Sequence, residues 1–348
     1  MTDRAVVIGA GAVGCLSALA LARRGWQVTL VDAGVTGGES SWAGGGILFP
    51  LLPWKYGESV NRLALAGAAA YPALSEQLLA TTGIDPQYQV SGIRVLADFG
   101  GDVALAWCRA HGVTAELSGG DLWLPAVAQA RNPRLMQALR ASVEVSGIQL
   151  MENTGLLPLR ESGGKINRWI STDGRHLEAD IFVLTAGAWS TGLLGVKAKA
   201  IQVKPMRGQM LLYQLPPGTL QHLLYHDDFY LIPRRDGHIL AGSTVEDVGF
   251  DKSTTAAAAA DLHRKAGRLL PALADAPIIK HWSGLRPGSP DNIPVIARHP
   301  DFDNLYLNTG HFRYGITMAP ASAEILAAQV GGETLPAWAD DYAFPREC

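Results

Sequence analysis

The start of the chain alternates between apolar runs and a glycine-rich turn. Residues 5–8 (AVVI) are apolar at every position, which is typical of a parallel strand that is buried on both faces. Residues 13–24 are also mostly apolar but rich in alanine and leucine, which favours a buried helix, and Gly25 follows as a stop signal. Residues 27–31 form a second strand-like run. The pattern predicts a β-α-β unit at this end of the chain.

The turn inside this unit reads GAGAVG and has the GxGxxG spacing of a dinucleotide-binding turn. Gly9 permits the tight turn, Gly11 leaves room for a pyrophosphate beside the backbone, and Gly14 lets the helix pack closely on the strand. Asp32 ends the second strand, about 20 residues beyond the glycines, where a carboxylate accepts both hydroxyls of a ribose. We therefore expect a bound dinucleotide with an unphosphorylated ribose.

A second segment dense in glycine and serine covers residues 33–48. A flexible surface linker is the simpler interpretation of such a composition. The segment is short, however, and it opens into an apolar run, so a second close approach of the backbone to a ligand explains it better. The hydroxyl groups of Ser40 and Ser41 could bind a diphosphate, and residues 45–47 could border a ring system.

Along the rest of the chain, the spacing of apolar residues changes twice between helical and strand-like patterns. Helical spacing is expected over residues 59–82, 132–146, 254–270 and 321–330, and strands within residues 147–150, 181–184, 209–213, 229–233 and 305–308. Pro72 should break or kink the first of these helices. Residues 87–129 and the stretch from residue 204 predict a second, strand-rich region, and Asp173-Gly174 predicts a hairpin turn. Residues 281–296 are dense in turn formers.

The bulk composition limits the partners of the chain. Its 348 residues suffice for one large or two ordinary domains, and 18% charged residues with a net charge of −3 offer no general attraction for nucleic acid or an anionic membrane. Residues 5–22 carry no charge and could be mistaken for a signal peptide or membrane helix, but the turn glycines and the strand-like first half argue against both. We expect small-molecule partners and no membrane.

The cysteines and histidines show no metal-binding pattern. Cys15, Cys108 and Cys348 are far apart, which is most simply explained by unpaired thiols in a reducing cytoplasm. The nine histidines form no HExxH or similar spacing. We expect a cytoplasmic protein without a metal.

Five sequence segments carry a family resemblance. They read VVIGAGAVG with VD, SSWAGGGIL, VLTAGAW, HWSGLRPGSPDNIPVIA and GHFRYGITMAP, and they extend from residue 5 to residue 320. Together they resemble the D-amino acid oxidase family of flavoproteins, and within it the glycine oxidase (ThiO-type) branch. The resemblance implies an α/β + β fold with two parts. These are a discontinuous Rossmann-like FAD-binding domain (residues 1–86, 130–203 and 287–348) and an inserted strand-rich α+β substrate domain (residues 87–129 and 204–286).

The resemblance also implies FAD as the cofactor. Some related amine oxidases, the monomeric sarcosine oxidases, tether the flavin to a cysteine near the position of residues 284–286, and the absence of a cysteine there implies non-covalent FAD. The residues implied as FAD contacts are Gly9, Gly11, Ala12, Val13, Gly14, Asp32, Ala33, Ser40, Ser41, Gly45, Gly46, Ile47, Leu156, His311, Phe312, Arg313, Tyr314, Gly315, Ile316 and Thr317.

An amino acid substrate presents a carboxylate, so its site needs a cation. Arg286 is the candidate, because a guanidinium forms a bidentate pair that lysine cannot copy. Without the resemblance, a surface salt bridge would be the simpler role for such an arginine. By similarity, Arg313 is a second substrate contact above the flavin, and the hydroxyl of Tyr230 helps to hold the carboxylate, although Tyr230 by itself would be a core aromatic.

The implied reaction is oxidative deamination of glycine, sarcosine or small D-amino acids. A hydride passes from Cα to flavin N5, water hydrolyses the imine to a 2-oxo acid and ammonia, and O2 reoxidises the flavin to give hydrogen peroxide. No general base is required, so His226 and His311 are assigned structural or flavin-side roles. Tyr314 follows Arg313 where relatives can carry a smaller polar residue, and residues 245–246 lie where the pocket lining varies among relatives, so the preferred side chain of the substrate stays open.

Several alternatives stay open from the sequence. The implied imine product would serve thiazole formation in thiamine biosynthesis. A D-amino acid dehydrogenase of the same fold, which passes electrons to a quinone or another carrier, is one alternative. A non-catalytic dinucleotide-binding protein is another. The sequence makes no prediction of the oligomeric state.

Overall fold

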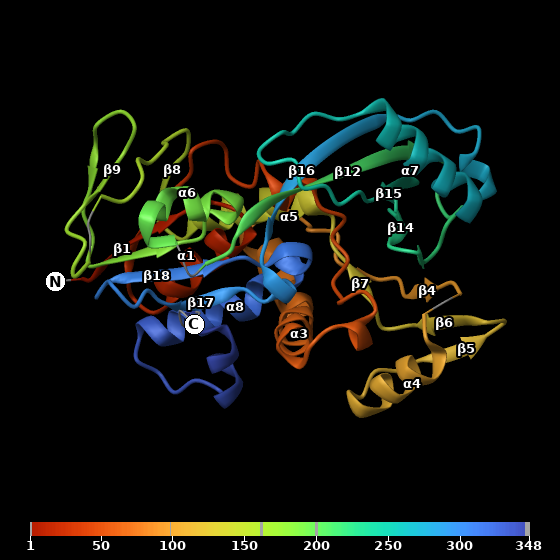
Figure 1. Ribbon diagram of the computed structural model, residues 1–348, viewed down its shortest axis with the longest axis horizontal. Coiled ribbons are helices and arrows are strands. Elements are labelled where there is room, and N and C mark those ends of the chain that lie inside the picture. Colours follow the sequence, from red (N-terminus) through yellow and green to blue (C-terminus); the bar gives the residue numbers. More distant parts are fainter. Residues whose placement is uncertain (1, 98, 161–162, 199–200, 345–348) are drawn as a thin grey trace.

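Two large sheets organise the chain in the computed structural model, which describes residues 2–97, 99–160, 163–198 and 201–344 (Figure 1). The first sheet has the order β17-β18-β11-β1-β2-β8. Its strands are β1 (Arg4–Ile8), β2 (Gln27–Val31), β8 (Gln149–Met151), β11 (Ile181–Leu184), β17 (Val295–Arg298) and β18 (Leu305–Thr309). All neighbouring pairs are parallel except β17 with β18.

Both faces of the first sheet are covered, which explains the uninterrupted apolar run of β1. Ala5 and Val7 belong to the core on one face, whereas Val6 and Ile8 belong to the core on the other. Helices α1 (Ala12–Arg23), α3 (Glu58–Thr82), α5 (Asn132–Val145) and α8 (Gly315–Val330) contribute buried side chains to the first of these cores. The β1-α1-β2 unit confirms the predicted β-α-β start.

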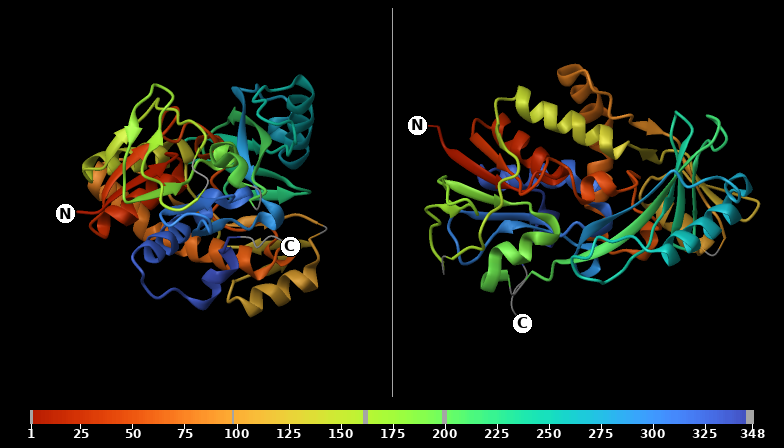
Figure 2. Two further views of the ribbon diagram at one scale, coloured as in Figure 1. Left: turned by 60° about the vertical axis from the view of Figure 1, so that its left-hand side comes forward. Right: turned by 90° about the horizontal axis from the view of Figure 1, so that it is seen from above.

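The second sheet has the order β16-β12-β15-β14-β13-β4-β6-β5. Its strands are β4 (Ile93–Val95), β5 (Glu116–Ser118), β6 (Asp121–Leu124), β12 (Lys204–Gln214), β13 (Leu223–His226), β14 (Phe229–Pro233), β15 (His238–Gly242) and β16 (Lys280–Gly288). Helices α4 (Gly101–Ala110) and α7 (Ala256–Leu269) accompany it. Figure 2 shows the two sheets at opposite ends of the molecule, with the long strands β12 and β16 reaching toward the first sheet.

The described part of the fold also contains short elements. They include α2 (Ser40–Ala43), α6 (Ser190–Leu194) and the pairs β3 (Gln89–Val90) with β7 (Ala128–Gln129) and β9 (Trp169–Ile170) with β10 (His176–Leu177), besides several 3-10 turns. The antiparallel β9–β10 pair confirms the hairpin predicted at Asp173-Gly174. Helix α4 lies in a region that was predicted only as strand-rich.

Three local predictions differ in detail from the structure. Helix α3 is not broken at Pro72, because its buried face, which includes Leu63 and Leu78, stays packed over its full length. The turn-rich residues 281–296 begin with the regular strand β16, in which Pro287 is tolerated because β16 is an edge strand of its sheet. Helix α8 begins at Gly315, six residues before the predicted start, and includes Pro320.

Candidate functional site

A cavity of about 920 Å³ lies where segments from both ends of the chain meet the second sheet. This volume is at the upper end of the range for cofactor pockets, roughly 300–1,000 Å³. Nearly all of the predicted FAD contacts line it: Gly9, Gly11, Ala12, Val13, Asp32, Ala33, Ser40, Ser41, Gly45, Gly46, Ile47, Leu156, His311, Phe312, Arg313, Tyr314, Gly315, Ile316 and Thr317. Arg286 and Tyr230 line it as well.

Gly14 is the one predicted contact that lies outside the lining described for this cavity. A Cβ atom at Gly14 would lie 1.7 Å from the carbonyl oxygen of Gly9, so a side chain there is incompatible with the turn. Gly9 itself has a φ of +106°, and a Cβ atom there would lie 2.6 Å from the carbonyl oxygen of Thr185. Gly14 therefore serves the close packing of turn and helix, which is the physical reason the motif predicts a glycine.

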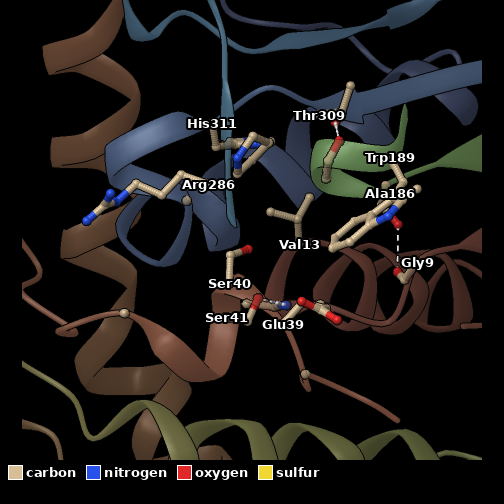
Figure 3. A pocket seen from close by; sticks show the side chains of 18 of the residues that line it. Gly9, Val13, Glu39, Ser40, Ser41, Ala186, Trp189, Arg286, Thr309 and His311 are labelled. Carbon is tan, nitrogen blue, oxygen red and sulfur yellow. Dashed lines mark hydrogen bonds between the residues drawn. The ribbon is translucent and has the colours of Figure 1, made fainter. Parts of the chain in front are cut away.

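The turn presents backbone N–H groups to the cavity. Helix α1 begins after Gly11, which caps it without a side-chain hydrogen bond. Ser41 accepts a hydrogen bond from the Ala12 N–H at 3.0 Å, and Ser40 and Ser41 lie below Val13 in Figure 3. The N–H groups that remain free at this helix start, beside two hydroxyl groups, form a suitable cradle for a diphosphate.

The Asp32 carboxylate lies at the carboxyl end of β2, next to this cradle. It accepts hydrogen bonds from the N–H groups of Ala10 at 2.7 Å and Gly34 at 2.8 Å. Burial raises the pKa of Asp32, and the two N–H groups oppose that shift. The bonds hold the carboxylate at the cavity edge, where a ribose can reach its free lone pairs.

The opposite part of the cavity is bordered by two chain segments that are far apart in the sequence. Gly46 has a φ of +75°, and a Cβ atom there would lie 2.1 Å from the Ala130 carbonyl oxygen. The start of α8 is tied to this loop, because the Thr317 hydroxyl donates to the Ile47 carbonyl oxygen at 3.0 Å. The two segments together form a narrow border for a flat ring system.

His311 lies on this border and is only 2% exposed. Burial lowers its pKa to about 3, so the ring is neutral at ordinary pH. Within the described residues its Nε2 atom has no hydrogen-bond partner. Because a buried polar atom normally has one, the site fits a bound polar group such as the flavin ring.

Arg286, on the edge strand β16, is partly buried and faces the cavity near His311 (Figure 3). Its Nη1 atom donates to the Thr244 carbonyl oxygen at 3.1 Å, and its Nη2 atom donates to the Ser243 hydroxyl at 2.6 Å. Burial lowers the pKa of Arg286, yet a guanidinium stays charged. The guanidinium lies against Gly208, where a Cβ atom would be 2.1 Å from Nη1.

No carboxylate in the described parts of the chain forms an ion pair with Arg286. The negative charge of Glu246 raises the pKa of Arg286, but the Glu246 carboxylate forms its ion pair with Arg207, at 2.6 Å. Ser243 and Thr244 use two of the five guanidinium N–H groups, and Tyr230 lies next to the same guanidinium. An unpaired cation in a cavity wall is costly, so this position is suited to an anionic ligand.

Tyr230 and Arg313 surround the same end of the cavity and both influence the pKa of Arg286. Tyr230 lies on β14, and its ring is close enough to Gly45 that a Cβ atom there would be 3.4 Å from Cε2. Arg313 Nη1 lies 3.9 Å from the Asp228 carboxylate, whose side chain is 75% exposed. Such a long, solvated pair is weak and leaves Arg313 available to a ligand.

Other predictions for the site had mixed outcomes. The Nδ1–H group of His226 donates to the Leu96 carbonyl oxygen at 2.9 Å, and His226 is outside the lining described for the cavity. Tyr314 lines the cavity and donates to the Leu51 carbonyl oxygen at 3.3 Å. Glu246 was expected in the pocket lining, but its carboxylate points to Arg207.

Sequence reasoning also missed residues that the fold places at the cavity. Trp189 lines it beside Gly9 and Ala186 (Figure 3), and its segment VLTAGAW carries the family resemblance without predicting a contact for Trp189. Lys252 lines the cavity and pairs with Glu39 at 2.9 Å. No local pattern marks Lys252, since it is a single lysine in a long connection between β15 and α7.

The described residues contain no group of three or more His, Cys, Asp and Glu side chains that could hold a metal. Cys15 and Cys108 are buried free thiols outside the lining described for the cavity, and Cys348 is outside the described residues. In the described part of the chain, no helix has the length and apolar character needed to cross a membrane.

One cavity thus brings together a glycine turn beside two hydroxyl groups, a carboxylate at the end of β2 and an arginine without a described carboxylate partner, which suits a dinucleotide and an anionic ligand. The family model for FAD dependent oxidoreductases (DAO) matches residues 4–329, and the chain belongs to this family. FAD is therefore its cofactor, and the predictions of family, fold class and cofactor are confirmed.

The individual relatives agree with this assignment. The chain is 42% identical to the glycine oxidase of Pseudomonas aeruginosa, over 95% of this chain and 96% of that protein. It is 31% identical to the bifunctional protein ThiO/ThiG of Trichormus variabilis, over 94% of this chain and 52% of that protein. The crystal structure of glycine oxidase from Geobacillus kaustophilus superposes with a TM-score of 0.91 at 25% identity and covers 100% of both chains.

Proposed function

We propose that this protein oxidises glycine, with sarcosine and small D-amino acids as further substrates, to the 2-oxo acid, an amine or ammonia, and hydrogen peroxide. The observation that carries the proposal is the unpaired Arg286 guanidinium on the cavity that also contains the dinucleotide turn. The 42% identity to a glycine oxidase supports glycine as the first substrate to test.

The residues that would hold non-covalent FAD divide the cavity into three parts. Asp32 would bind the ribose, the start of α1 at Ala12 and Val13 with the two serines would bind the diphosphate, and residues 45–47 and 311–317 would border the ring system. When bound, FAD supplies two-electron oxidation of a C–H bond and the subsequent reduction of O2.

The residues of the chain would orient the substrate and exclude water. Arg286 binds the substrate carboxylate with its remaining N–H groups, and Tyr230 and Arg313 complete the anion site. Fixing the carboxylate limits where the Cα–H bond can lie relative to the ring border, which lowers the entropic cost of reaction. The buried, neutral His311 is not needed as a base, because the reactive substrate form carries a neutral amine.

The same proposal assigns FAD binding and substrate binding to different domains. Residues 1–86, 130–203 and 287–348 would bind FAD, and residues 87–129 and 204–286 would carry the substrate site with Tyr230 and Arg286. The ThiO-type resemblance supports a further step, in which the imine product serves thiazole formation in thiamine biosynthesis.

A substrate panel assayed by peroxide release tests the proposed activity. Arg286→Ala should lower kcat/KM for glycine by an amount that corresponds to a loss of about 3–5 kcal/mol of transition-state stabilisation, because two charge-assisted hydrogen bonds to the carboxylate are lost. Arg286→Lys should recover only part of the loss. The matched control is Arg94→Ala, which removes an arginine of the same sheet whose side chain is 35% exposed and pairs with Asp121.

The alternatives give different results in the same assay. Reduction of an artificial acceptor by glycine or a D-amino acid without peroxide would indicate a dehydrogenase. Purified protein without the flavin band at about 450 nm would favour a binding protein without this chemistry. Unchanged kcat/KM in flavin-loaded Arg286→Ala would refute the role of Arg286.

A further inference from the structure

An ion pair with one buried partner, Arg207, lies behind the substrate end of the cavity but outside the lining described for it. Arg207, on β12, is only 4% exposed. Its Nη2 atom donates to the Glu246 carboxylate at 2.6 Å, and its Nη1 atom donates to the Asp251 carboxylate at 2.6 Å and to the Ser253 hydroxyl at 3.2 Å. The desolvation of Arg207 offsets much of the electrostatic attraction between the charges, so the ion pair adds little to the free energy of unfolding. A role other than stabilising the fold would explain it better.

The pair fixes the segment that follows β15. Glu246 also accepts hydrogen bonds from the Thr244 hydroxyl at 2.5 Å and from the Gln209 side-chain amide at 2.8 Å. The Thr244 hydroxyl in turn accepts the Gln209 N–H at 2.9 Å. Two main-chain hydrogen bonds of 2.9 Å connect Arg207 and Glu246 directly. Residues 243–246 are thereby attached to β12 by side-chain and main-chain bonds.

This same segment holds the guanidinium of Arg286. The Thr244 carbonyl oxygen and the Ser243 hydroxyl accept its two described hydrogen bonds. The alternation of side chains along β12 separates the two arginines: Arg207 and Gln209 point to one face, and Gly208 exposes its backbone to Arg286 on the other. The ion pair therefore contacts the backbone support of Arg286 without approaching the substrate itself.

We propose that the Arg207–Glu246 pair is a positioning unit that sets the orientation of Arg286 for a substrate carboxylate. The inference rests on the proposed function, because it concerns the group that would bind the substrate. A loosened 243–246 segment would let the guanidinium rotate away, and its bidentate fit to a carboxylate would be lost. FAD contacts would be untouched, since neither residue is among those lining the cavity.

The test uses the flavin-loaded enzyme with Glu246→Gln and Arg207→Met. Each variant should raise the KM for glycine about tenfold or more and change kcat by less than about threefold, because the lost interaction is ground-state binding of the carboxylate. Acetate, a minimal carboxylate, should bind more weakly by a similar factor, measured by its perturbation of the flavin absorption spectrum. The spectrum without acetate should equal that of the wild type.

The matched control is Lys204→Met. Lys204 lies on the same strand and pairs with Asp247 of the same loop at 2.5 Å, but both side chains are exposed, so KM and acetate binding should not change. Thr244→Val supplies a milder variant, since it removes only the hydroxyl that joins Glu246 to Gln209. Its shift in KM should have the same direction.

A double-mutant cycle with Arg286→Lys distinguishes a specific effect on the position of Arg286 from a general loosening of the second sheet. If Glu246 acts through Arg286, Glu246→Gln should add little to Arg286→Lys. Unchanged KM and acetate affinity in flavin-loaded Glu246→Gln or Thr244→Val, or full additivity in the cycle, would overturn the inference. Failure of the wild type to oxidise glycine would instead refute the proposed function, and the acetate titration would still test the positioning unit.

Discussion

Gly208→Ala is expected to disable the substrate site while leaving the fold and the FAD site intact. Gly208 lies on β12 opposite Gly284 of β16, and the Arg286 guanidinium occupies the space where a side chain would project. An added Cβ atom would lie 2.1 Å from Nη1 and 2.4 Å from Cζ and Nη2 of Arg286. These are the far end of a flexible side chain, so the guanidinium moves and the strands stay.

The size of the effect follows from the displacement. Ordinary contact with a Cβ atom begins at about 3.4 Å, so Nη1 must retreat by about 1.3 Å. A misplacement of about 1 Å in a positioning group costs up to about 100-fold in rate, or roughly 2.7 kcal/mol. We expect kcat/KM for glycine to fall by a factor of about 30–100, and acetate affinity to fall with it.

Peroxide release and acetate titration of the flavin-loaded variant measure this effect. Gly101→Ala is the matched control, because a Cβ atom at this first residue of α4 meets only an ordinary contact of 3.7 Å to Phe99. The thermal midpoint of Gly208→Ala should stay within a few degrees of the wild type. If kcat/KM falls by less than threefold, the guanidinium is not held against Gly208 in the working enzyme and the reasoning fails.

Three further predictions address the cofactor half of the cavity. Arg234→Met should lower the free energy of unfolding by about 2–4 kcal/mol and weaken FAD binding, measured by denaturation and by flavin titration. The reason is that buried Arg234 donates to the Gly45 carbonyl oxygen at 2.7 Å, and the substitution leaves such partners unpaired. Gly14→Ala should yield no folded flavoprotein on purification, because the clash is with the main chain of the turn. Burial lowers the pKa of His311 to about 3, whereas its value in the unfolded chain is about 6.5. Between pH values of about 3 and 6.5 the unfolded chain therefore binds a proton that the folded protein does not. The free energy of unfolding should fall as the pH drops from about 6.5 toward 3. His311→Asn should flatten that part of the stability profile, and an unchanged slope would contradict a neutral His311.

Local sequence patterns were sufficient to predict the β-α-β unit and the glycine turn that line one part of the cavity. The strand β1, the glycine turn, helix α1 and Asp32 lie within the first 32 residues, so their geometry depends on short-range sterics and on burial of adjacent apolar positions. The substrate-side candidates depended on the family resemblance instead. Without it, nothing in the surroundings of Arg286 in the sequence distinguishes it from a surface arginine.

The β-α-β start, its glycine turn and the presence of a second strand-rich region can be predicted from the amino-acid sequence alone, because each is encoded by neighbouring residues. The surroundings of Arg286 depend on the tertiary fold. The β12–β16 register places Gly208 against the guanidinium, and the segment after β15 supplies its hydrogen-bond acceptors. The Arg207–Glu246 pair also forms across 39 residues of sequence. Register and long-range pairing are set by the packing of whole strands, and no local pattern of residue types specifies them.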